Sequence, residues 1–436
     1  MNRYLDLKRL YRRSLRSNCK SFAANVSRGG AIALLLFISG CQSTGTTNSK
    51  LRMGTVLPIT GDLAQYGSPM QDSARLLVET VNACNGVLGQ PVELISEDDQ
   101  TEPAAGASAM TKLAEVDRVA GVVGAASSAV SSAAIDIAVR NQLVQISPAS
   151  TSPLFTERAR KGEFQGFWFR TAPPDTFQGQ ALARLAKTRG YQSISILAIN
   201  NDYGNGLVDS FIPAFKALGG KVTNPTRYPP DASTFTSEVG AAFQGNPDAV
   251  LLIAYPETGS LILKAAYQQG LLGKQTQVLA TDGLKDAKIA DLVGKNPQGT
   301  YIAAGILGTA ASAGGPALSE FRNRYSQAYK REPSVYDPNT WDAAALLVLA
   351  AEAAKQPTGP AIKDQIRTVA NAPGQEVTDV CQALALVRQG QDINYQGASS
   401  SVDLDAQGDV GGSYDIWTID PKGELKVTGK IEVGGS

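Results

Sequence analysis

Apolar runs alternate with helical patterns along most of the chain, and residues 122–151 display the arrangement most clearly. An apolar run at 119–123 ends in Gly124, a segment of helical periodicity follows at 129–140, and a second apolar run occupies 143–146. Short apolar runs bounded by glycine, proline and small polar residues are typical of buried strands. The stretch therefore predicts a strand, a tight turn, a helix, a second strand and a second turn.

Both predicted turns are rich in hydroxyl groups, because Ser127 and Ser128 follow the first strand and the run from Ser147 to Thr151 follows the second. In an open parallel sheet, such turns lie at the carboxyl ends of neighbouring strands, where ligands bind. Helix amino termini there present free N–H groups and a partial positive charge, which suit a carboxylate. The alternative is that the two serines only cap a helix.

The same alternation predicts two α/β regions, each in the order of a doubly wound parallel sheet. In the first region we expect strands at 52–57, 92–96, 119–123 and 143–146, and helices at 67–81, 103–116 and 128–140. After a break at 151–166, we expect strands at 194–199, 221–228, 249–253, 277–280 and 300–304. The helices of this second region are expected at 177–188, 204–218, 235–243, 256–269 and 286–292.

Beyond Gly305 the pattern becomes helical and then ends in strands. We expect helices at 316–330, 339–354 and 361–369, and strands at 413–419 and 424–431. The alanine-rich part at 343–354 is apolar, but it is short and contains Glu352. It therefore predicts a core helix rather than a membrane span.

The amino-terminal segment has the composition of an export signal. Residues 1–30 hold eight Lys or Arg residues, the run at 31–38 is continuously apolar, and Ser39-Gly40-Cys41 follows. A basic region, a short apolar region and small residues in this order are typical of a secretory signal, and the apolar run is too short to span a bilayer. We expect a signal peptide at 1–40 and a flexible polar tether at 41–50.

The amino-acid composition disfavours several classes of function. The formal charge is zero over all 436 residues, but residues after 40 hold 32 basic and 39 acidic side chains, a net of −7. This surface gives no electrostatic reason to bind nucleic acid. The chain has no histidine, which excludes catalytic triads, acid–base steps and metal sites that need one.

Its four cysteines form no CxxC pair, and the phosphate-binding GxxxxGK and nucleophile GxSxG motifs are missing from the sequence. We therefore expect no metal, no cofactor and no enzymatic activity. Catalysis by carboxylates alone is made less favourable by this composition but is not excluded.

From Leu51 onward, the chain resembles the bacterial periplasmic binding proteins for leucine, isoleucine and valine, the solute receptors of ABC transporters. The motifs that carry the resemblance occur in order: Gly61 to Gly67, Gly124 to Ser128, Ser147 to Thr151, Phe169-Arg170-Thr171, Asp202-Tyr203-Gly204, Tyr255-Pro256-Glu257 and Thr281-Asp282-Gly283. The resemblance implies two doubly wound α/β lobes joined by three crossover strands, the type 1 periplasmic binding protein fold. Lobe 1 would comprise residues 51–170 and 306–409, and lobe 2 residues 171–305 and 410–436.

The resemblance also implies ligand-binding residues in lobe 1. Ser128 and Thr151 match hydroxyl groups that bind an α-carboxylate, and Ala149 and Ser150 match residues that contribute backbone groups. Tyr66 matches a tyrosine that flanks the pocket for the ligand side chain.

In lobe 2, Asp282 matches the carboxylate that holds the α-ammonium group. Tyr203 and Tyr255 match tyrosines near the same ammonium group and the ligand side chain. The alternatives are that the tyrosines pack between domains and that Asp282 is an ordinary turn aspartate. Trp168, beside the first crossover, is expected in the core.

The implied function is capture of a free neutral amino acid, branched-chain or otherwise aliphatic, by closure of the two lobes, and delivery to an ABC permease. The resemblance of Ile38 to Cys41 to a bacterial lipobox implies cleavage before Cys41 and its acylation, and hence a protein tethered to the membrane outside the cytoplasm. We expect it to be a monomer. The alternative for Cys41 is a buried thiol. Alternative functions are a bilobed sensor for a short amide or urea-like ligand and a secreted hydrolase with a carboxylate pair.

We hypothesise a disulfide between Cys84 and Cys381. Both fall in lobe 1 of the implied partition, and the expected compartment oxidises thiols. The alternative is two separate buried cysteines.

Overall fold

A computed structural model of the chain describes residues 50–273 and 275–433. The expected signal peptide, Cys41 and the tether up to residue 49 lie outside the described residues. Within those residues, the strands form a five-stranded sheet, a seven-stranded sheet and a small two-stranded sheet. No helix in this part of the chain is both long and apolar enough to cross a bilayer.

The five-stranded sheet is parallel throughout and has the order β2-β1-β3-β4-β5. Its strands are β1 (Arg52–Leu57), β2 (Glu93–Asp98), β3 (Gly121–Gly124), β4 (Val144–Ser147) and β5 (Trp168–Arg170). The helices that connect or follow them are α1 (Ala64–Ala83), α2 (Pro103–Thr111), the π-helix η1 (Lys112–Val116), α3 (Ser128–Arg140) and α4 (Leu154–Arg160).

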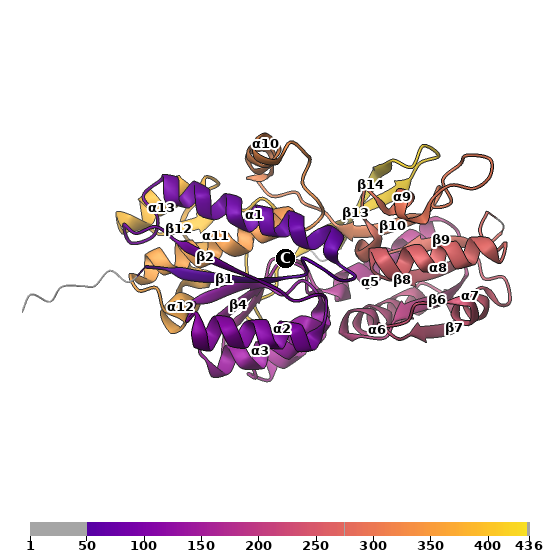
Figure 1. Ribbon diagram of the computed structural model, residues 1–436, viewed down its shortest axis with the longest axis horizontal. Helices are drawn as coiled ribbons and strands as arrows, with labels where there is room; N and C mark the ends of the chain where they lie inside the picture. The colour runs from indigo at the N-terminus through magenta and orange to yellow at the C-terminus, as the bar shows by residue number, and fades with distance from the viewer. Residues whose placement is uncertain (1–49, 274, 434–436) are drawn as a thin grey trace, which may run out of the picture. The chain divides into compact units, whose positions relative to one another are not determined.

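Helices cover both faces of this sheet. Successive strand residues point to opposite faces, so the apolar residues of one strand pack against different helices. Met53 packs into a core with residues of α1 and of later helices, whereas Val56 packs with α2 and α3 on the other face (Figure 1). The later helices are α10 (Leu318–Tyr329), α11 (Asp337–Ala354), α12 (Gly359–Ala370) and α13 (Val380–Arg388), with the small sheet β11 (Gln375–Val377) and β12 (Ile393–Tyr395).

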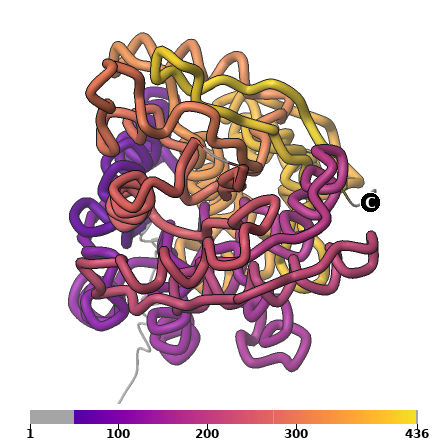
Figure 2. The backbone as a smooth tube through the Cα atoms, turned by 90° about the vertical axis from the view of Figure 1, so that its right-hand side faces the viewer, coloured from indigo at the N-terminus to yellow at the C-terminus, as the bar shows by residue number. Residues whose placement is uncertain are grey.

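The seven-stranded sheet has the order β14-β13-β10-β9-β8-β6-β7. Strands β6 (Ser193–Ile199), β7 (Lys221–Tyr228), β8 (Ala249–Ile253), β9 (Gln277–Ala280) and β10 (Leu307–Ala311) are parallel. The hairpin β13 (Gly412–Ile419) and β14 (Leu425–Val433) extends the sheet, and β13 pairs antiparallel with β10. The last strands of the chain therefore lie at one edge of this sheet (Figure 2). The associated helices are α5 (Asp175–Thr188), α6 (Asp202–Ala217), α7 (Thr236–Phe243), α8 (Pro256–Gln268), the 3₁₀ turn η2 (Asp282–Leu284) and α9 (Ile289–Val293).

The fold class is confirmed: two doubly wound α/β sheets follow one another along the chain. Strands Arg52–Leu57, Lys221–Tyr228, Ala249–Ile253 and Gln277–Ala280 and helix Ser128–Arg140 have the bounds expected from the sequence. The break expected at 151–166 contains the short helix α4, and α13 was not expected at all. The helix expected at 103–116 is present over that length, as α2 followed without a break by the π-helix η1.

The strand expected at 300–304 is wrong. Tyr301 makes only an isolated bridge with Lys295, and the chain turns at Gly305, whose φ is +88°. The strand follows as β10, which pairs with β9 and β13. The two short apolar runs on either side of Gly305 look alike in sequence, so pattern alone could not choose between them. Residues 307–311 therefore belong to the seven-stranded sheet.

The hypothesis of a Cys84–Cys381 disulfide is confirmed by the geometry. The two cysteines are bonded, their Cα atoms are 5.8 Å apart, and 297 residues separate them in the sequence. Cys84 caps the carboxyl end of α1 and Cys381 lies in the first turn of α13. The bridge therefore fastens the later helices to the first one on the same face of the five-stranded sheet.

Candidate functional site

A small, largely enclosed cavity lies between the turns of the two large sheets. Its lining residues on the side of the five-stranded sheet are Leu63, Tyr66, Met70, Ala126, Ser127, Ser128, Ala149 and Tyr336. On the side of the seven-stranded sheet they are Tyr203, Tyr255, Asp282 and Gly283. Six of the eight predicted ligand residues are therefore brought together, while Ser150 and Thr151 do not line the cavity.

Nearly all of these residues follow the carboxyl end of a parallel strand. Ser128 follows β3, Ala149 follows β4, Tyr203 follows β6, Tyr255 follows β8 and Asp282 follows β9. This edge of an open α/β sheet is where ligands bind, because the turns there are free of the sheet's own hydrogen bonds. The doubly wound pattern is what brings such distant residues to one place.

Tyr66 reaches the cavity because the loop after β1 and the first turn of α1 approach closely. A Cβ atom on Gly67 would stand 1.8 Å from the carbonyl oxygen of Pro58, so only glycine fits there. The loop is held by Asp98, whose Oδ1 accepts hydrogen bonds from the N–H groups of Ile59 (3.0 Å) and Thr60 (3.2 Å).

Asp282 is the only acidic residue among the described residues that line the cavity, and its carboxylate is 4% exposed. Tyr203 donates to Oδ1 over 2.8 Å, and Tyr336 donates to Oδ2 over 2.6 Å. Burial raises the pKa of Asp282, and these hydrogen bonds oppose the rise. Among the described residues no cation pairs with Asp282, and a buried carboxylate held by neutral donors alone is suited to receiving a positive group of a ligand.

A second buried acid, Asp175, stands beside Asp282 at the start of α5. The hydroxyl of Thr151 donates to its Oδ2 over 3.0 Å, whereas Oδ1 has no hydrogen-bond partner. Burial raises the pKa of Asp175 well above its ordinary value, and the negative charge of Asp282 adds to the rise. Sequence reasoning missed Asp175, which is the first residue of α5 and follows shortly after β5.

Side chains also meet across the cavity. The hydroxyl of Tyr66 donates to the carbonyl oxygens of Asp282 (3.4 Å) and Gly283 (3.3 Å), and Ser127 Oγ lies 3.4 Å from Tyr255 Oη. Ser127 precedes α3 but its side chain makes no capping hydrogen bond. The alternative that Ser127 serves only as a cap is therefore wrong, although neither it nor Tyr336 was predicted as a site residue.

The tyrosines form two ring pairs around Asp282. Tyr203 and Tyr255 stack with ring centroids 5.6 Å apart, and Tyr66 meets Tyr336 edge to face at 6.3 Å. Tyr336 lies just before α11, in the helical half of the chain. A tyrosine at the start of a helix, without a preceding strand, gives no sequence signal for a site, which explains why it was missed.

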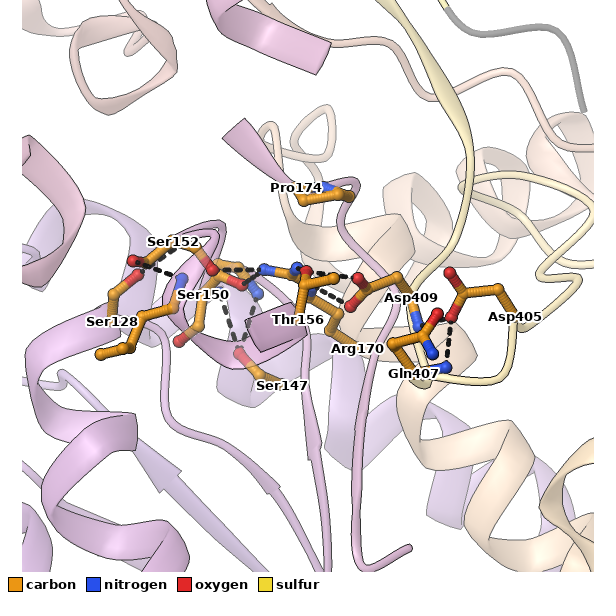
Figure 3. A network of polar contacts seen from close by, with 12 residues as sticks. Ser128, Ser147, Ser150, Ser152, Thr156, Arg170, Pro174, Asp405, Gln407 and Asp409 are labelled. Atoms are coloured by element: carbon orange, nitrogen blue, oxygen red, sulfur yellow. Dashed lines mark hydrogen bonds and ion pairs between the residues drawn. The ribbon is translucent and has the colours of Figure 1, made fainter. Parts of the chain in front are cut away.

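The polar groups of the turn after β4 bond mainly to one another and to the turn after β3. The hydroxyl of Ser150 is fully buried and donates within its own lobe, toward the carbonyl oxygens of Ala125 and Ala126. The N–H groups of Ala149 and Ser150 donate to Ser147 Oγ over 3.3 and 2.9 Å. Ser128 Oγ accepts from the N–H of Ser152 over 3.3 Å, which joins the two hydroxyl-rich turns (Figure 3).

The rest of the lining is apolar. Leu63, Met70 and Ala126 are at most 6% exposed, and none of the described lining residues is basic. Within the described part of the chain, no three His, Cys, Asp or Glu side chains are arranged to hold a metal ion. Trp168 is buried and stacks on Phe155 at 4.2 Å, which confirms it as a core residue.

The chain is similar in sequence and structure to known binding proteins. It is 27% identical over 363 residues, 81% of this chain and 83% of the relative, to the chemotactic signal transduction system substrate-binding protein BasB of Halobacterium salinarum. The leucine-binding protein LivK of Thermotoga maritima matches with a TM-score of 0.73 and 26% identity, covering 88% of this chain and 99% of that chain.

Two further solved structures share the fold at lower identity. The substrate-binding protein LivJ of Streptococcus pneumoniae, in complex with isoleucine, matches with a TM-score of 0.71, 22% identity and coverage of 88% and 99%. A solute-binding protein of Rhodopseudomonas palustris, in complex with 3,4-dihydroxybenzoic acid, matches with a TM-score of 0.68, 18% identity and coverage of 88% and 97%. The periplasmic binding protein family model matches residues 50–392, and the chain therefore belongs to the periplasmic binding protein family.

Proposed function

We propose that this protein is an extracytoplasmic solute-binding lipoprotein that captures a free neutral amino acid, branched-chain or otherwise aliphatic, and presents it to an ABC permease. Binding would occur without turnover. The single observation that carries the proposal is the setting of Asp282: a buried carboxylate without a paired cation, in a cavity lined otherwise by hydroxyl and apolar groups. An ammonium group would supply the missing positive charge.

The other end of a zwitterion would be met on the opposite side. Ser128 offers a hydroxyl group at the start of α3, where the first N–H groups of the helix have no side-chain cap, and this setting suits a carboxylate without a basic side chain. Leu63, Met70 and Ala126 would contact an aliphatic side chain. In this proposal, Thr151 acts through Asp175, and Ser150 acts through the backbone of its turn.

Closure of two lobes would complete the site. Lobe 1 would centre on the five-stranded sheet and the helices from α10 to α13, and lobe 2 on the seven-stranded sheet. The crossovers would then lie near Arg170, after Ala311 and near Gly412. The contacts from Tyr66 to Gly283 and from Tyr336 to Asp282 join the two sides, which supports a closed form stabilised by contacts across the cavity.

We also propose a lipid tether at Cys41 and an ABC permease as the partner. Acylation of Cys41 would hold the protein at the membrane surface, where a permease would receive the closed, loaded form. The periplasmic binding protein family model supports a permease as the partner, and the export signal expected before Cys41 supports the tether. We expect a monomer.

A sensory role is the second candidate, because BasB is named as part of a chemotactic system. In that case the same closed form would dock on a signalling partner instead of a permease. An aromatic acid, as in the Rhodopseudomonas complex, is a weaker candidate ligand here. Such a ligand has no ammonium group to offset the buried charge of Asp282.

The proposal is tested by native mass spectrometry of the protein purified without denaturation, followed by a thermal-shift panel of amino acids, short amides and benzoates. We expect a co-purified neutral amino acid and the largest thermal shifts with aliphatic amino acids. Stabilisation by benzoates or amides, with none by any amino acid, would reject the proposed ligand class.

A further inference from the structure

Arg170 is a fully buried arginine that does not line the cavity. It ends β5, at the point where the chain leaves the five-stranded sheet for α5. Its Nε donates to Asp409 Oδ1 over 2.7 Å, and its backbone N–H donates to the carbonyl oxygen of Gly408 over 2.9 Å. Arg170 therefore holds two of the segments that connect the two large sheets against each other.

The same guanidinium group also holds the turn after β4. Its Nη1 donates to the carbonyl oxygens of Ser150 and Ser152, each over 3.0 Å. Its Nη2 donates over 2.7 Å to the hydroxyl of Thr156, which in turn donates to Asp409 Oδ2 over 2.5 Å. One planar group thus binds the turn, α4 and the segment before β13 together (Figure 3).

This turn leads directly to the cavity. Ser152 donates its N–H to Ser128 Oγ, and Ser150 donates its hydroxyl to the carbonyl oxygens of Ala125 and Ala126. Ser128 and Ala126 line the cavity. A displacement of Arg170 would therefore move the donors that face the ligand, although Arg170 itself is out of reach of it.

We propose that Arg170 is a positioning residue that sets the geometry of the ligand-facing turn from the crossover segments. Arg170 itself lies on the crossover after β5, and its acceptors lie on the turn, on α4 and on the segment before β13, so the shape of the turn depends on these segments. The identity of the ligand in this proposal rests on the proposed function. The requirement for arginine at this position rests on the five N–H donors of its guanidinium group. A lysine offers a single ammonium group and cannot serve these acceptors in one plane.

The alternative is that Arg170 only stabilises the fold and has no effect on the ligand-facing turn. Loss of Arg170 alone would leave Asp409 buried without its cation and would destabilise the protein whatever its role. The informative variant is therefore the double substitution Arg170→Met with Asp409→Asn, which removes both charges. Arg158→Met is the matched control, because Arg158 pairs with Asp136 and Glu163 in the same lobe without contacting the turn.

The first readout compares affinity for L-leucine, by isothermal titration, with the thermal midpoint. We expect the double variant to recover the midpoint relative to Arg170→Met while its affinity stays at least tenfold below that of the unmodified protein. Arg158→Met should bind within twofold of the unmodified protein. Recovery of both midpoint and affinity in the double variant would overturn the proposal.

The second readout needs no ligand and separates this proposal from the proposed function. Hydrogen–deuterium exchange of residues 147–152 in the unliganded protein should be at least tenfold faster in the double variant than in Arg158→Met. Unchanged exchange in that turn would overturn the proposal. If the unmodified protein binds no amino acid at all, the proposed function fails, and the exchange result still decides the role of Arg170.

Discussion

The hydroxyl of Tyr336 donates to Asp282 Oδ2 over 2.6 Å, and the two residues belong to opposite sides of the cavity. Tyr336 precedes α11, which packs on the five-stranded sheet, whereas Asp282 follows β9 of the seven-stranded sheet. This hydrogen bond is buried and involves a carboxylate, so it is stronger than an ordinary surface contact. It joins the two sides where we propose the ammonium group binds.

Substitution of Tyr336 by Phe should weaken ligand binding about tenfold, because the closed form loses one hydrogen bond to a charged group. Titration calorimetry with L-leucine measures the change. Tyr329→Phe is the matched control, since Tyr329 donates to the carbonyl oxygen of Asp72 over 2.8 Å and does not line the cavity. Equal losses in the two variants would remove the special role of Tyr336.

Affinity should fall as the pH is lowered. Burial raises the pKa of Asp282, and an ammonium ligand requires the ionised carboxylate. The decline should therefore begin at a higher pH than an ordinary aspartate would give. Binding curves for L-leucine between pH 8 and pH 4 measure this dependence, with Asp282→Asn as the variant that should lose it. An affinity that rises toward low pH would contradict the assignment.

Asp99 should make the fold less stable at neutral pH than at acidic pH. It is fully buried, Oδ1 accepts from the N–H of Thr101 over 2.8 Å, and Oδ2 has no hydrogen-bond partner. Burial raises the pKa of Asp99 to about 7. Because the unfolded chain ionises at lower pH, the free energy of unfolding should decrease as the pH rises from about 4 through 7, by up to about 4 kcal/mol.

Asp99→Asn keeps the acceptor for Thr101 and removes the charge. Denaturant unfolding should show this variant gaining stability relative to the unmodified protein as the pH rises from 4.5 to 8. A difference between the two proteins that does not vary with pH would show that Asp99 does not titrate in this range.

Loss of the Cys84–Cys381 bridge should lower stability by about 2–5 kcal/mol, because the reduced chain gains freedom when unfolded. The double substitution of both cysteines by serine, compared in denaturant with the unmodified protein, measures the loss. At temperatures well below the thermal midpoint, the affinity for L-leucine should be unchanged, because Cys84 lies at the far end of α1 from Tyr66. In a variant with Cys19 and Cys41 replaced by serine, two free thiols in the denatured, unreduced protein would contradict the bridge.

Much of the fold could be predicted because its strands are short apolar runs that end in polar turns. The exact bounds of β1, β8 and α3 follow from this contrast. The pattern failed around Gly305, where two similar apolar runs compete, and only sheet pairing selects the second as β10. Helix α13 was missed although its apolar residues pack into the same core as α1.

The site was predictable to the extent that its residues follow strands. Ser128, Ala149, Tyr203, Tyr255 and Asp282 do so, and all line the cavity. Tyr336 reaches the same place from the start of α11, which follows another helix, and Asp175 from the start of α5, after β5, a strand that the sequence did not predict. Thr151 was expected to face the ligand, but its hydroxyl donates to Asp175, a partner that sequence spacing could not reveal.

The central claim is that Asp282 holds the ammonium group of a bound amino acid. The most direct measurement is a calorimetric cycle of two ligands, L-leucine and 4-methylpentanoate, which lacks the amine, against the unmodified protein and Asp282→Asn. We predict that the unmodified protein binds L-leucine at least tenfold more tightly than 4-methylpentanoate, and that Asp282→Asn abolishes most of this preference. An unchanged preference in Asp282→Asn, or none in the unmodified protein, would contradict the account.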